Sequence, residues 1–300
     1  MFNGILNVRK EKGFTSHDVV AKLRGILRQK KIGHTGTLDP AAEGVLPVCL
    51  GSATKLVEFL TDRTKSYRAV LLLGVETDSQ DMTGTVLRTR EVLCDEDELR
   101  AAARSFIGGY DQIPPMYSAK KQGGKKLVDL ARQGITVERP ARRVDISDIC
   151  FEEIVLPRAV MTVDCGKGTY IRTLCHDIGE KLGCGGAMEA LLRTRVGSFR
   201  LEDAYSLSEL EAAMRVGEIE DKIVSIEDCL ALYPARKAMP EADAKLRNGN
   251  AVGESAVSDA TDAEGALVRL YLSDGSFVGL FQKRGGQYWA EKMFLERGAD

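Results

Sequence analysis

The chain has 300 residues, enough for one large domain and a small one, each with its own core. Hydrophobic residues make up 44% and charged residues 29%, and no apolar run is long enough to cross a bilayer, so we expect a globular protein without a membrane anchor. The seven cysteines form no C-x-x-C pair, which argues against a disulfide framework or a structural zinc site and favours a cytoplasmic protein.

The net charge of −2 hides a segregation of charge along the chain. Between residues 24 and 31 there are four basic residues and no acidic one, and between 116 and 143 there are eight basic residues and two acidic ones. Residues 201–230 reverse this balance, with nine acidic residues against two basic ones. A local basic patch is what a phosphate-binding surface needs, although basic runs can equally be solvated faces.

Hydrophobic periodicity and turn residues predict strands and helices in irregular alternation. In chain order we predict a strand at 4–10, a helix at 15–27, a glycine-rich loop at 33–44, strands at 45–51 and 67–73, a helix at 95–107, an exposed insertion at 110–142, strands at 143–155 and 158–165, and helices at 169–182 and 207–216. The last of these helices starts at a capping box, Ser206 with Glu209. This pattern favours an α+β fold over a doubly wound one.

After Tyr233 and Pro234 the pattern of the sequence changes. Short strands between Gly and Asn turns are predicted at 246–252, 267–272, 276–281 and 288–294. The sequence therefore predicts two domains, a larger one over 1–236 and a small β-rich module over 237–300.

The most informative segment is GHTGTLDPAAEGVLP at residues 33–47. Two glycines within four residues let the backbone turn sharply, and Asp39, which precedes a proline, is biased to an extended backbone that fixes the direction of its carboxylate. The segment lacks the G-x-x-x-x-G-K-[ST] pattern of a phosphate-binding P-loop. On these residues alone, a tight turn with a structural aspartate remains an alternative.

This segment closely resembles the active-site motif of the TruB-type pseudouridine synthases, the bacterial tRNA pseudouridine-55 synthases. Further similar segments follow in order along the chain: GILNVRKEKGFTS at 4–16, KSYR at 65–68, QIPPMYSA at 112–119, ARQGI at 131–135, GTYIRTL at 168–174, LLRTR at 191–195 and LRNGNAV at 246–252. The resemblance implies a pseudouridine synthase fold, with a central, mainly antiparallel mixed sheet flanked by helices, and a small C-terminal RNA-binding β-barrel of the PUA type.

The resemblance also implies a reaction and its catalytic residues. Uridine-55 in the TΨC loop of tRNA would be isomerised: the bond from C1′ to N1 breaks, the uracil turns, and C1′ rejoins at C5. Nothing is oxidised or added, so neither a cofactor nor a metal is expected. The resemblance assigns the catalytic carboxylate to Asp39 and the active-site arginine to Arg172, whose planar fork can hold a carboxylate bidentately. Tyr67 would stack on the flipped uracil and relay a proton.

Without the resemblance, Arg172 would be interpreted as a surface arginine at a helix start and Tyr67 as a core aromatic. His34 corresponds to a residue that intrudes into the tRNA loop, and Leu192 to an apolar residue that packs against the base; their local sequence alone indicates a polar loop residue and a plain core residue. Three more residues are expected to contact the substrate: Lys65, Gly36 and Thr37.

Extruding a stacked base costs free energy that contacts elsewhere on the RNA must supply. The candidates to bind phosphates are Lys31, Lys120, Lys121, Lys125, Lys126, Arg132, Arg139, Arg142 and Arg143. We expect charge reversal in the insertion to weaken tRNA binding and to flatten its salt dependence.

Three other interpretations stay open at this point. A non-catalytic RNA chaperone would not need Asp39, Tyr67 and Arg172, although a chaperone role could also accompany catalysis. A glycosidase-type hydrolase would pair Asp39 with Glu43, but no feature provides for an activated water. A guide-RNA-dependent enzyme is the form of the archaeal and eukaryotic relatives; the compact C-terminal module favours a stand-alone bacterial form, which we expect to be a monomer without an obligate protein partner. The residues do not decide whether Asp39 attacks C1′ or abstracts a ribose proton.

Overall fold

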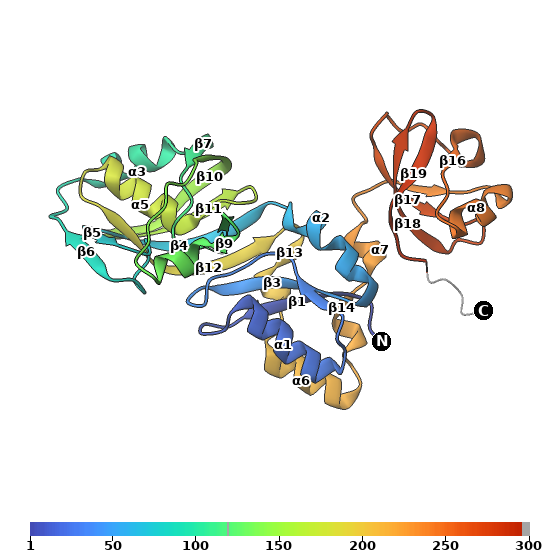
Figure 1. The fold of residues 1–300 in the computed structure, drawn as a ribbon, viewed down its shortest axis with the longest axis horizontal. Coiled ribbons are helices and arrows are strands. Elements are labelled where there is room, and N and C mark those ends of the chain that lie inside the picture. Colours follow the sequence, from blue (N-terminus) through green and yellow to red (C-terminus); the bar gives the residue numbers. More distant parts are fainter. Residues whose placement is uncertain (119, 296–300) are drawn as a thin grey trace.

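The structure is a computed structural model that describes residues 1–118 and 120–295; the side chains of residues 121, 122 and 126 lie outside that description. Ten of its strands form one sheet (Figure 1). They are β1 (Gly4–Lys10), β2 (Ile32–His34), β3 (Glu43–Leu50), β4 (Lys65–Leu73), β7 (Gly108–Gln112), β10 (Arg142–Val155), β11 (Arg158–Cys165), β12 (Gly186–Val196), β13 (Phe199–Arg200) and β14 (Ile223–Val224).

The main path of this sheet runs β14-β1-β3-β12-β4-β11-β10-β7, and β2 and β13 pair with β3 and β12 beside it. Among these described strands, every pairing is antiparallel except that of β12 with β3. This confirms the expected central, mainly antiparallel mixed sheet. Strand β12 was not predicted, because charged residues interrupt its apolar pattern; one of them, Arg193, is nevertheless buried.

Helices cover the sheet in two groups (Figure 1). Helices α1 (Ser16–Leu27) and α6 (Leu207–Val216) share an apolar cluster with β1 and β3, and both begin at capping boxes, the one at Ser206 as predicted. Helices α3 (Glu96–Arg104) and α5 (Ile171–Lys181) pack over β4, β10 and β11. Two short helices, α2 (Val57–Thr61) and α7 (Ile226–Cys229), lie toward the C-terminal part of the molecule.

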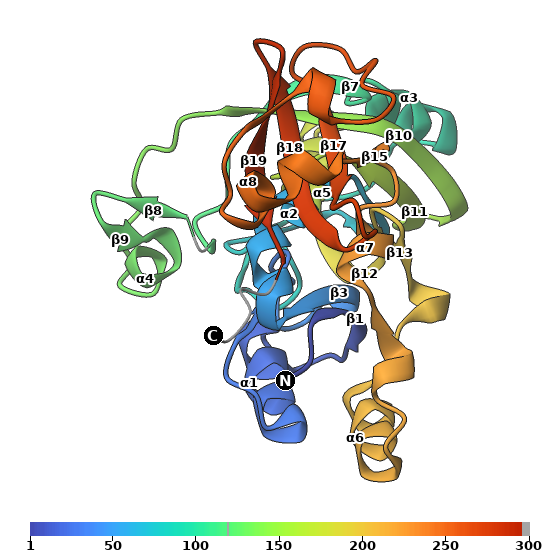
Figure 2. The ribbon, with the colours of Figure 1, turned by 90° about the vertical axis from the view of Figure 1, so that its right-hand side faces the viewer.

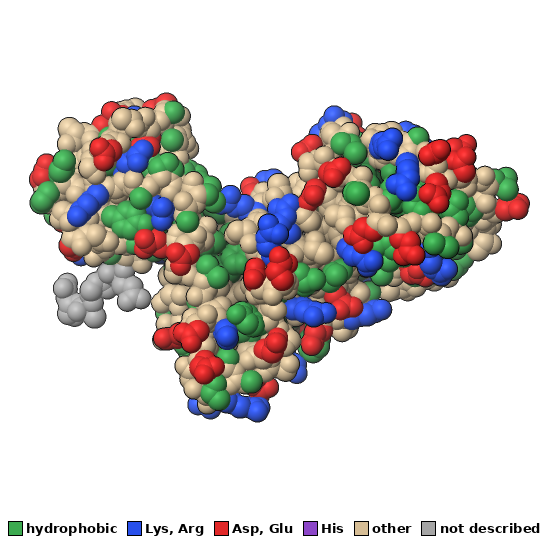
Figure 3. Space-filling model, turned by 180° about the vertical axis from the view of Figure 1, so that it is seen from behind, with side chains coloured by type: hydrophobic (Ala, Val, Ile, Leu, Met, Phe, Trp, Pro, Cys, Tyr) green, Lys and Arg blue, Asp and Glu red, His purple; other side chains and the backbone are tan. Residues whose placement is uncertain are grey.

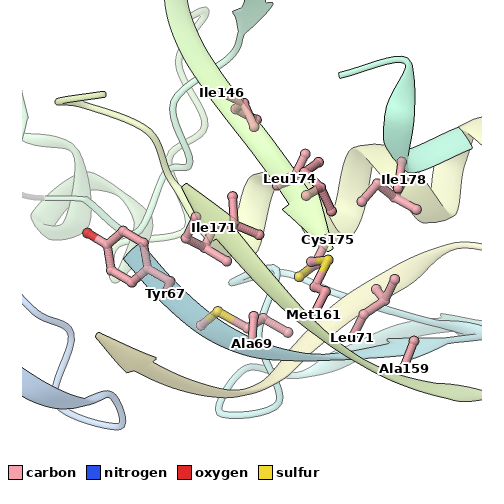
Figure 4. Close-up of a cluster of buried hydrophobic side chains, with 14 of the residues drawn as sticks. Tyr67, Ala69, Leu71, Ile146, Ala159, Met161, Ile171, Leu174, Cys175 and Ile178 are labelled. Carbon is pink, nitrogen blue, oxygen red and sulfur yellow. The ribbon is translucent and has the colours of Figure 1, made fainter. Parts of the chain in front are cut away.

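The cluster beneath α5 contains Tyr67 and neighbours of Asp39, and it supports the site described below (Figure 4). Alternate residues of β4 point into it, because successive side chains of a strand face opposite sides of the sheet. Its labelled members are Tyr67, Ala69 and Leu71 from β4, Ile146 from β10, Ala159 and Met161 from β11, and Ile171, Leu174, Cys175 and Ile178 from α5. Helix α5 is thereby fixed directly over β4.

Two smaller elements project from the sheet. One is a hairpin of β5 (Val75–Thr77) and β6 (Val86–Thr89). The other contains β8 (Lys121–Gln122), β9 (Lys125–Lys126) and α4 (Leu127–Ala131), and it extends to one side in Figure 2. The expected insertion at 110–142 is shorter than predicted, because β7 and the start of β10 belong to the main sheet.

The C-terminal part is a five-stranded sheet around its own apolar core. Its order is β15 (Ala235–Lys237), β17 (Leu267–Tyr271), β18 (Phe277–Arg284), β19 (Gln287–Met293) and β16 (Val252–Gly253). The predicted strand at 246–252 is wrong: helix α8 (Asp243–Arg247) ends there and Gly249 turns the chain with φ +75°, which leaves only residues 252–253 extended.

Seen from behind, a notch separates this C-terminal part from the main sheet, and acidic side chains are frequent on the lobe that α1 and α6 build (Figure 3). That lobe contains the acidic segment 201–230 noted in the sequence. Among the described residues, no helix combines the length and the apolar character that a membrane span requires.

Candidate active site

Asp39 lies in the loop between β2 and β3, and its apolar neighbours anchor that loop. Leu38 and Ala42 are buried in the cluster that contains Tyr67. The amide of Ala42 donates to the Asp39 carbonyl at 3.0 Å, and the amide of Leu38 donates to Ser16 Oγ at 2.9 Å. The loop is thus fixed on both sides of Asp39, whose side chain is 35% exposed.

A buried lysine, Lys10, donates hydrogen bonds to the backbone of the same loop. Lys10 has no exposed surface, and its Nζ donates to the carbonyls of Ala42 at 2.6 Å, Glu11 at 3.0 Å and Pro40 at 3.3 Å. Burial lowers the pKa of Lys10 to about 8, against the opposing effect of Glu43 and Asp39. Its ammonium group therefore holds the backbone on the C-terminal side of Asp39.

Arg172, the second residue of α5, faces Asp39 and is only 5% exposed. Its Nη2 lies 3.4 Å from Oδ1 and 3.3 Å from Oδ2 of Asp39, and also donates to the Tyr117 carbonyl at 2.7 Å. Its Nη1 lies 3.6 Å from Oδ2 of Asp81. The expected bidentate fork is therefore wrong in detail, because one nitrogen spans both oxygens of Asp39 while the other faces Asp81.

Asp81 belongs to the site although nothing in its sequence context singles it out. It lies between β5 and β6, is 7% exposed, and accepts hydrogen bonds from Ser79 Oγ at 2.8 Å and the Thr83 amide at 2.9 Å. Its surroundings, TDSQDMTG at 77–84, are typical of a surface turn. Asp81 is brought into contact with Arg172, the partner of Asp39, only by the packing of the β5–β6 hairpin near α5. The sequence alone does not reveal this contact.

The electrostatic balance at Asp39 combines opposing effects. Burial raises the pKa of Asp39 above its usual range, the Arg172 guanidinium lowers it, and Asp81 raises it further. The carboxylate is therefore a stronger base than an exposed aspartate, yet it has a cation in contact when it ionises. This is the state that a group attacking carbon or accepting a proton requires.

Tyr67 lies near Asp39, on β4, and is 7% exposed. Its hydroxyl points away from the apolar cluster in Figure 4. Burial raises the pKa of Tyr67, an effect that Asp39 reinforces and Arg193 opposes. The phenol is therefore neutral at physiological pH, so its hydroxyl can donate a hydrogen bond.

Strand register places Leu192 on the face of the sheet opposite to that of Tyr67. In the pairing of β12 with β4, Leu191 lies opposite Ala69, Leu192 opposite Arg68 and Arg193 opposite Tyr67. Directly opposed side chains share a face, so Leu191 and Arg193 share the face of Tyr67 and Leu192 does not. Leu191 packs against the cluster that contains Tyr67. The apolar residue of β12 on the face of Tyr67 is therefore Leu191.

Two residues expected to contact the substrate, His34 and Lys65, have different surroundings. His34 is half-buried on β2; it accepts a hydrogen bond from the Gly36 amide at 3.4 Å, and burial lowers its pKa, so the ring is neutral at pH 7. Thr37 next to it is exposed. Lys65 is 6% exposed and donates to the carbonyls of Thr61 and Arg63, both at 2.8 Å. Its ammonium group is therefore occupied by backbone at the end of α2 rather than presented to a substrate.

The basic residues expected to bind phosphate lie around Tyr170 and on the surface. Lys120 Nζ lies 5.5 Å and Arg172 Cζ 5.8 Å from the centroid of the Tyr170 ring, so two cations flank it. Exposed side chains are those of Lys31, Lys125, Arg132, Arg142 and Arg143. The half-exposed Arg139 donates to the Pro114 carbonyl at 3.2 Å. The side chains of Lys121 and Lys126 lie outside the described residues.

Two family models match the chain consecutively. The model described as "TruB family pseudouridylate synthase (N terminal domain)" matches residues 24–171, and that described as "tRNA pseudouridylate synthase B C-terminal domain" matches residues 172–237. The chain is 43% identical over 298 residues to a tRNA pseudouridine synthase B of Clostridium perfringens, covering 98% of this chain and 99% of the relative. It is 56% identical over 217 residues to that of Alkaliphilus oremlandii, covering 72% and 73%.

Solved structures give the same picture of the fold. A Cbf5-Nop10-Gar1 complex contains a chain that superposes with a TM-score of 0.76 and 28% identity, covering 98% of this chain and 85% of that one. An H/ACA RNP bound to a substrate RNA containing 2′-deoxyuridine contains one with a TM-score of 0.75 and 26% identity, covering 98% and 86%. Both likenesses extend over the main sheet and the C-terminal sheet together.

Proposed function

The chain belongs to the TruB family of pseudouridylate synthases, and from this premise we propose that it isomerises uridine-55 in the TΨC loop of tRNA, with Asp39 as the catalytic carboxylate. Its relatives at 40–56% identity are named tRNA pseudouridine synthase B, so tRNA is the substrate class. The observation that carries the assignment to Asp39 is its contact with the buried Arg172 at 3.3 Å, beside a cluster in which its neighbours Leu38 and Ala42 pack with Tyr67.

The proposed chemistry needs an ionised oxygen on Asp39 close to the ribose. The oxygen either attacks C1′, so that uracil leaves with the electrons of the C1′–N1 bond, or removes a ribose proton. On the second route the electrons of the C2′–H bond form a C1′=C2′ double bond as uracil leaves. After the uracil turns, C5 bonds to C1′; this breaks the bond from Asp39 to C1′ on the first route and returns the proton to C2′ on the second. The C5 proton is then lost and N1 gains a proton. Arg172 offsets the charge of Asp39 before attack, and the neutral Tyr67 phenol lies where it can relay a proton.

Base flipping is part of the proposal, since the ribose of a stacked nucleotide is shielded. Tyr67 and Leu191 offer an aromatic and an apolar surface on one face of the sheet, which suits an extruded uracil. His34 lies on the neighbouring β2, and its neutral ring can enter an RNA loop without the desolvation cost of a charge. We therefore assign displacement of the base to His34 and its support to Tyr67 and Leu191.

The alternative of a hydrolase with paired carboxylates gains no support from the site. Glu43, the first residue of β3, raises the pKa of Lys10. The carboxylate that raises the pKa of Asp39 is that of Asp81, not that of Glu43. Asp81 faces Arg172, and one of its oxygens accepts hydrogen bonds from Ser79 and Thr83. A general acid would instead need a carboxyl oxygen free to deliver a proton to the substrate, whereas both oxygens of Asp81 already face protein donors.

The proposal is tested with unmodified tRNA and two proteins, the wild type and Asp39→Asn. We expect pseudouridine at position 55 alone with the wild type and none with the variant, at similar tRNA affinity. Labelling of pseudouridine at its position in the sequence is the readout. Product at another position would reject the site assignment, release of free uracil would favour hydrolysis, and full activity of the variant would reject Asp39.

We also propose that the parts of the chain have separate tasks. Residues 1–236 would form the catalytic unit, with the basic insertion binding RNA, and residues 237–300 a PUA-like module. The module's separate apolar core supports this division. We expect the protein to act as a stand-alone monomer. Light scattering of the free protein and of its tRNA complex tests the monomer; a dimer in both would reject it.

A tRNA-folding role can be separated from catalysis by the same Asp39→Asn protein. The exposed basic residues of the insertion do not depend on the carboxylate for their position, so the variant should still bind and loosen tRNA. Refolding of a misfolded tRNA is the measurement. A refolding rate no higher than in buffer alone would reject this role while leaving the isomerase untouched.

A further inference from the structure

Arg193 is a buried charge in the centre of the sheet. It lies on β12, is 1% exposed, and is the largest fully buried side chain among the described residues. Across residues 1–118 and 120–295, no carboxylate forms an ion pair with it. Removing a guanidinium from water costs several kcal/mol unless other groups compensate. A charge kept there without a counterion therefore needs an explanation.

Three hydrogen bonds of Arg193 go to carbonyls of the segment 36–45 around Asp39, and its side chain also hydrogen-bonds that of Tyr67. Its Nε donates to the Val45 carbonyl at 2.7 Å, its Nη2 to the Gly36 carbonyl at 3.3 Å, and its Nη1 lies 3.5 Å from the Thr37 carbonyl. Gly36 and Thr37 precede Asp39, and Val45 follows it. One planar group therefore connects the two ends of the catalytic loop.

The backbone reinforces this connection at Gly44. Arg193 and Gly44 are partners in the parallel pairing between β12 and β3. Gly44 has a φ of +111°, and a Cβ there would lie 2.1 Å from the Arg193 carbonyl oxygen. The loop end and β12 are thus in direct backbone contact, which only glycine permits.

The position of Arg193 also connects the loop to Tyr67. The two residues are directly opposed in the pairing of β12 with β4, so their side chains share a face. Arg193 lowers the pKa of Tyr67 and of His34, although burial has the larger effect on both, raising that of Tyr67 and lowering that of His34. The charge of Arg193 therefore influences the pKa values of Tyr67 and His34, in addition to binding the loop.

We propose that Arg193 is a positioning residue: its guanidinium fastens both ends of the 36–45 loop and so fixes Asp39 opposite Tyr67. The inference rests on the proposed function for its catalytic part, but its structural part concerns only the loop. The geometry requires arginine, because three carbonyls at separate positions need a planar group with several donors. A lysine ammonium keeps the charge but is a single point with a shorter reach.

The experiment compares Arg193→Met, Arg193→Lys and a matched control, Arg195→Met. Arg195 is on the same strand, but it donates to Ser66 at 2.9 Å and Asp164 at 2.8 Å rather than to the loop. Hydrogen exchange of residues 33–45 is measured in the tRNA-free protein. Single-turnover rate and tRNA affinity are measured beside it, so that a loss of positioning can be distinguished from a loss of binding.

We expect Arg193→Met to speed exchange of the loop amides at least ~10-fold and to lower the single-turnover rate by roughly 100-fold, since small displacements of a catalytic group have effects of that size. Its tRNA Kd should stay within about threefold, because the guanidinium is buried away from solvent. Arg193→Lys should be intermediate in exchange and rate. Arg195→Met should match the wild type in loop exchange and rate.

Unchanged loop exchange in Arg193→Met would overturn the proposal, as would faster exchange spread evenly over the whole sheet. If Arg193→Met does not fold, Arg193→Lys decides, and wild-type loop exchange and rate in that variant overturn it. A wild-type protein that makes no pseudouridine would reject the proposed function, while loop exchange would still test the fastening.

Discussion

Single residues in this protein carry charges that their surroundings make costly, and Asp39 is the clearest case. Burial outweighs Arg172 in setting the pKa of Asp39, so the ionised carboxylate is disfavoured relative to the unfolded chain. Arg172 keeps a second carboxylate, Asp81, within reach. Free energy of folding is thus given up to keep a reactive oxygen at this position.

A gain in stability should follow when the charge of Asp39 is removed. The pKa of Asp39 in the folded protein lies above the unfolded value of 3.8. Between these two pKa values the folded state binds more protons than the unfolded chain. The contribution of Asp39 to the free energy of unfolding therefore falls as pH rises through that range. Asp39→Asn should therefore raise the melting temperature at pH 7.5, with the gain shrinking toward pH 3.8. Calorimetry across this range checks it; a lower melting temperature at pH 7.5 would contradict it.

Lys65 should make stability rise in alkaline solution. Burial lowers its folded pKa from 10.5 to about 8, so between these values the unfolded chain binds one proton more than the folded one, and stability increases with pH. In Lys65→Met this contribution should disappear. Urea unfolding from pH 7.5 to 10 measures the slope. An identical slope in wild type and variant would mean that burial does not perturb this lysine.

At the scale of elements, the site is an assembly of short connections held against rigid parts. The loop before β3 supplies Asp39, the turn between β5 and β6 supplies Asp81, and α5 supplies Arg172. The insertion reaches the same guanidinium through the Tyr117 carbonyl. Three segments distant in sequence thus converge on the Arg172 side chain of α5, so a change in the outer two should alter the chemistry.

Asp81→Asn should lower the isomerisation rate with little effect on tRNA affinity. Without the second carboxylate, Nη1 of Arg172 loses its ionic partner, and the guanidinium is free to reorient relative to Asp39. We expect a fall of about 10- to 100-fold in the single-turnover rate, the scale seen when a supporting group is removed. Glu76→Gln is the matched control on the same hairpin, since Glu76 pairs with Arg90 at 3.5 Å. Equal rates in both variants would remove Asp81 from the site.

Elements with local signals were predictable and those that depend on packing were not. Capping boxes and turn residues lie within a few positions of each other, so the starts of α1 and α6 followed from the sequence. Strand β12 was hidden because Arg193 is buried through contacts with a loop about 150 residues away in the chain. That Leu191 rather than Leu192 shares the face of Tyr67 could not be predicted for a related reason: a strand reverses its facing side at every residue, and register is a tertiary property.

The candidate site divides in the same way. Asp39 and Arg172 could be proposed because a recognisable motif surrounds each, and the structure brings them together. Asp81 and Lys10 were missed, since a turn-like sequence and a strand-end lysine reveal nothing of their burial. Lys65 was expected at the substrate because burial of its ammonium by two carbonyls cannot be inferred from its neighbours.

On the scale of the whole molecule, charge is arranged by region rather than by total. The basic insertion lies near α5, while the acidic segment 201–230 builds the lobe of α6 with the opposite balance. Such a distribution can attract RNA to one side and disfavour its approach to another. The modest net charge of −2 conceals this polarity.

Reversing charges in the insertion should change the salt dependence of tRNA binding. For Lys120→Glu with Lys125→Glu, we expect weaker binding and a shallower slope of log Kd against log salt, by about 0.7 to 0.9 for each phosphate that the variant no longer neutralises. Arg104→Glu with Lys181→Glu on α3 and α5 is a control of equal charge, at exposed residues outside the insertion. Filter binding over a range of salt concentrations gives both slopes. Parallel slopes for the two double variants would place the insertion outside the interface.

Besides the buried Leu38 and Ala42, the loop around Asp39 is secured through its peptide groups: Lys10, Ser16 and Arg193 all bind its backbone. The identities of the side chains at positions 41 and 43 therefore contribute little to holding it in place. Such a segment can accumulate substitutions there while keeping its shape. Those two positions are natural starting points for randomised libraries aimed at changing RNA preference without rebuilding the scaffold.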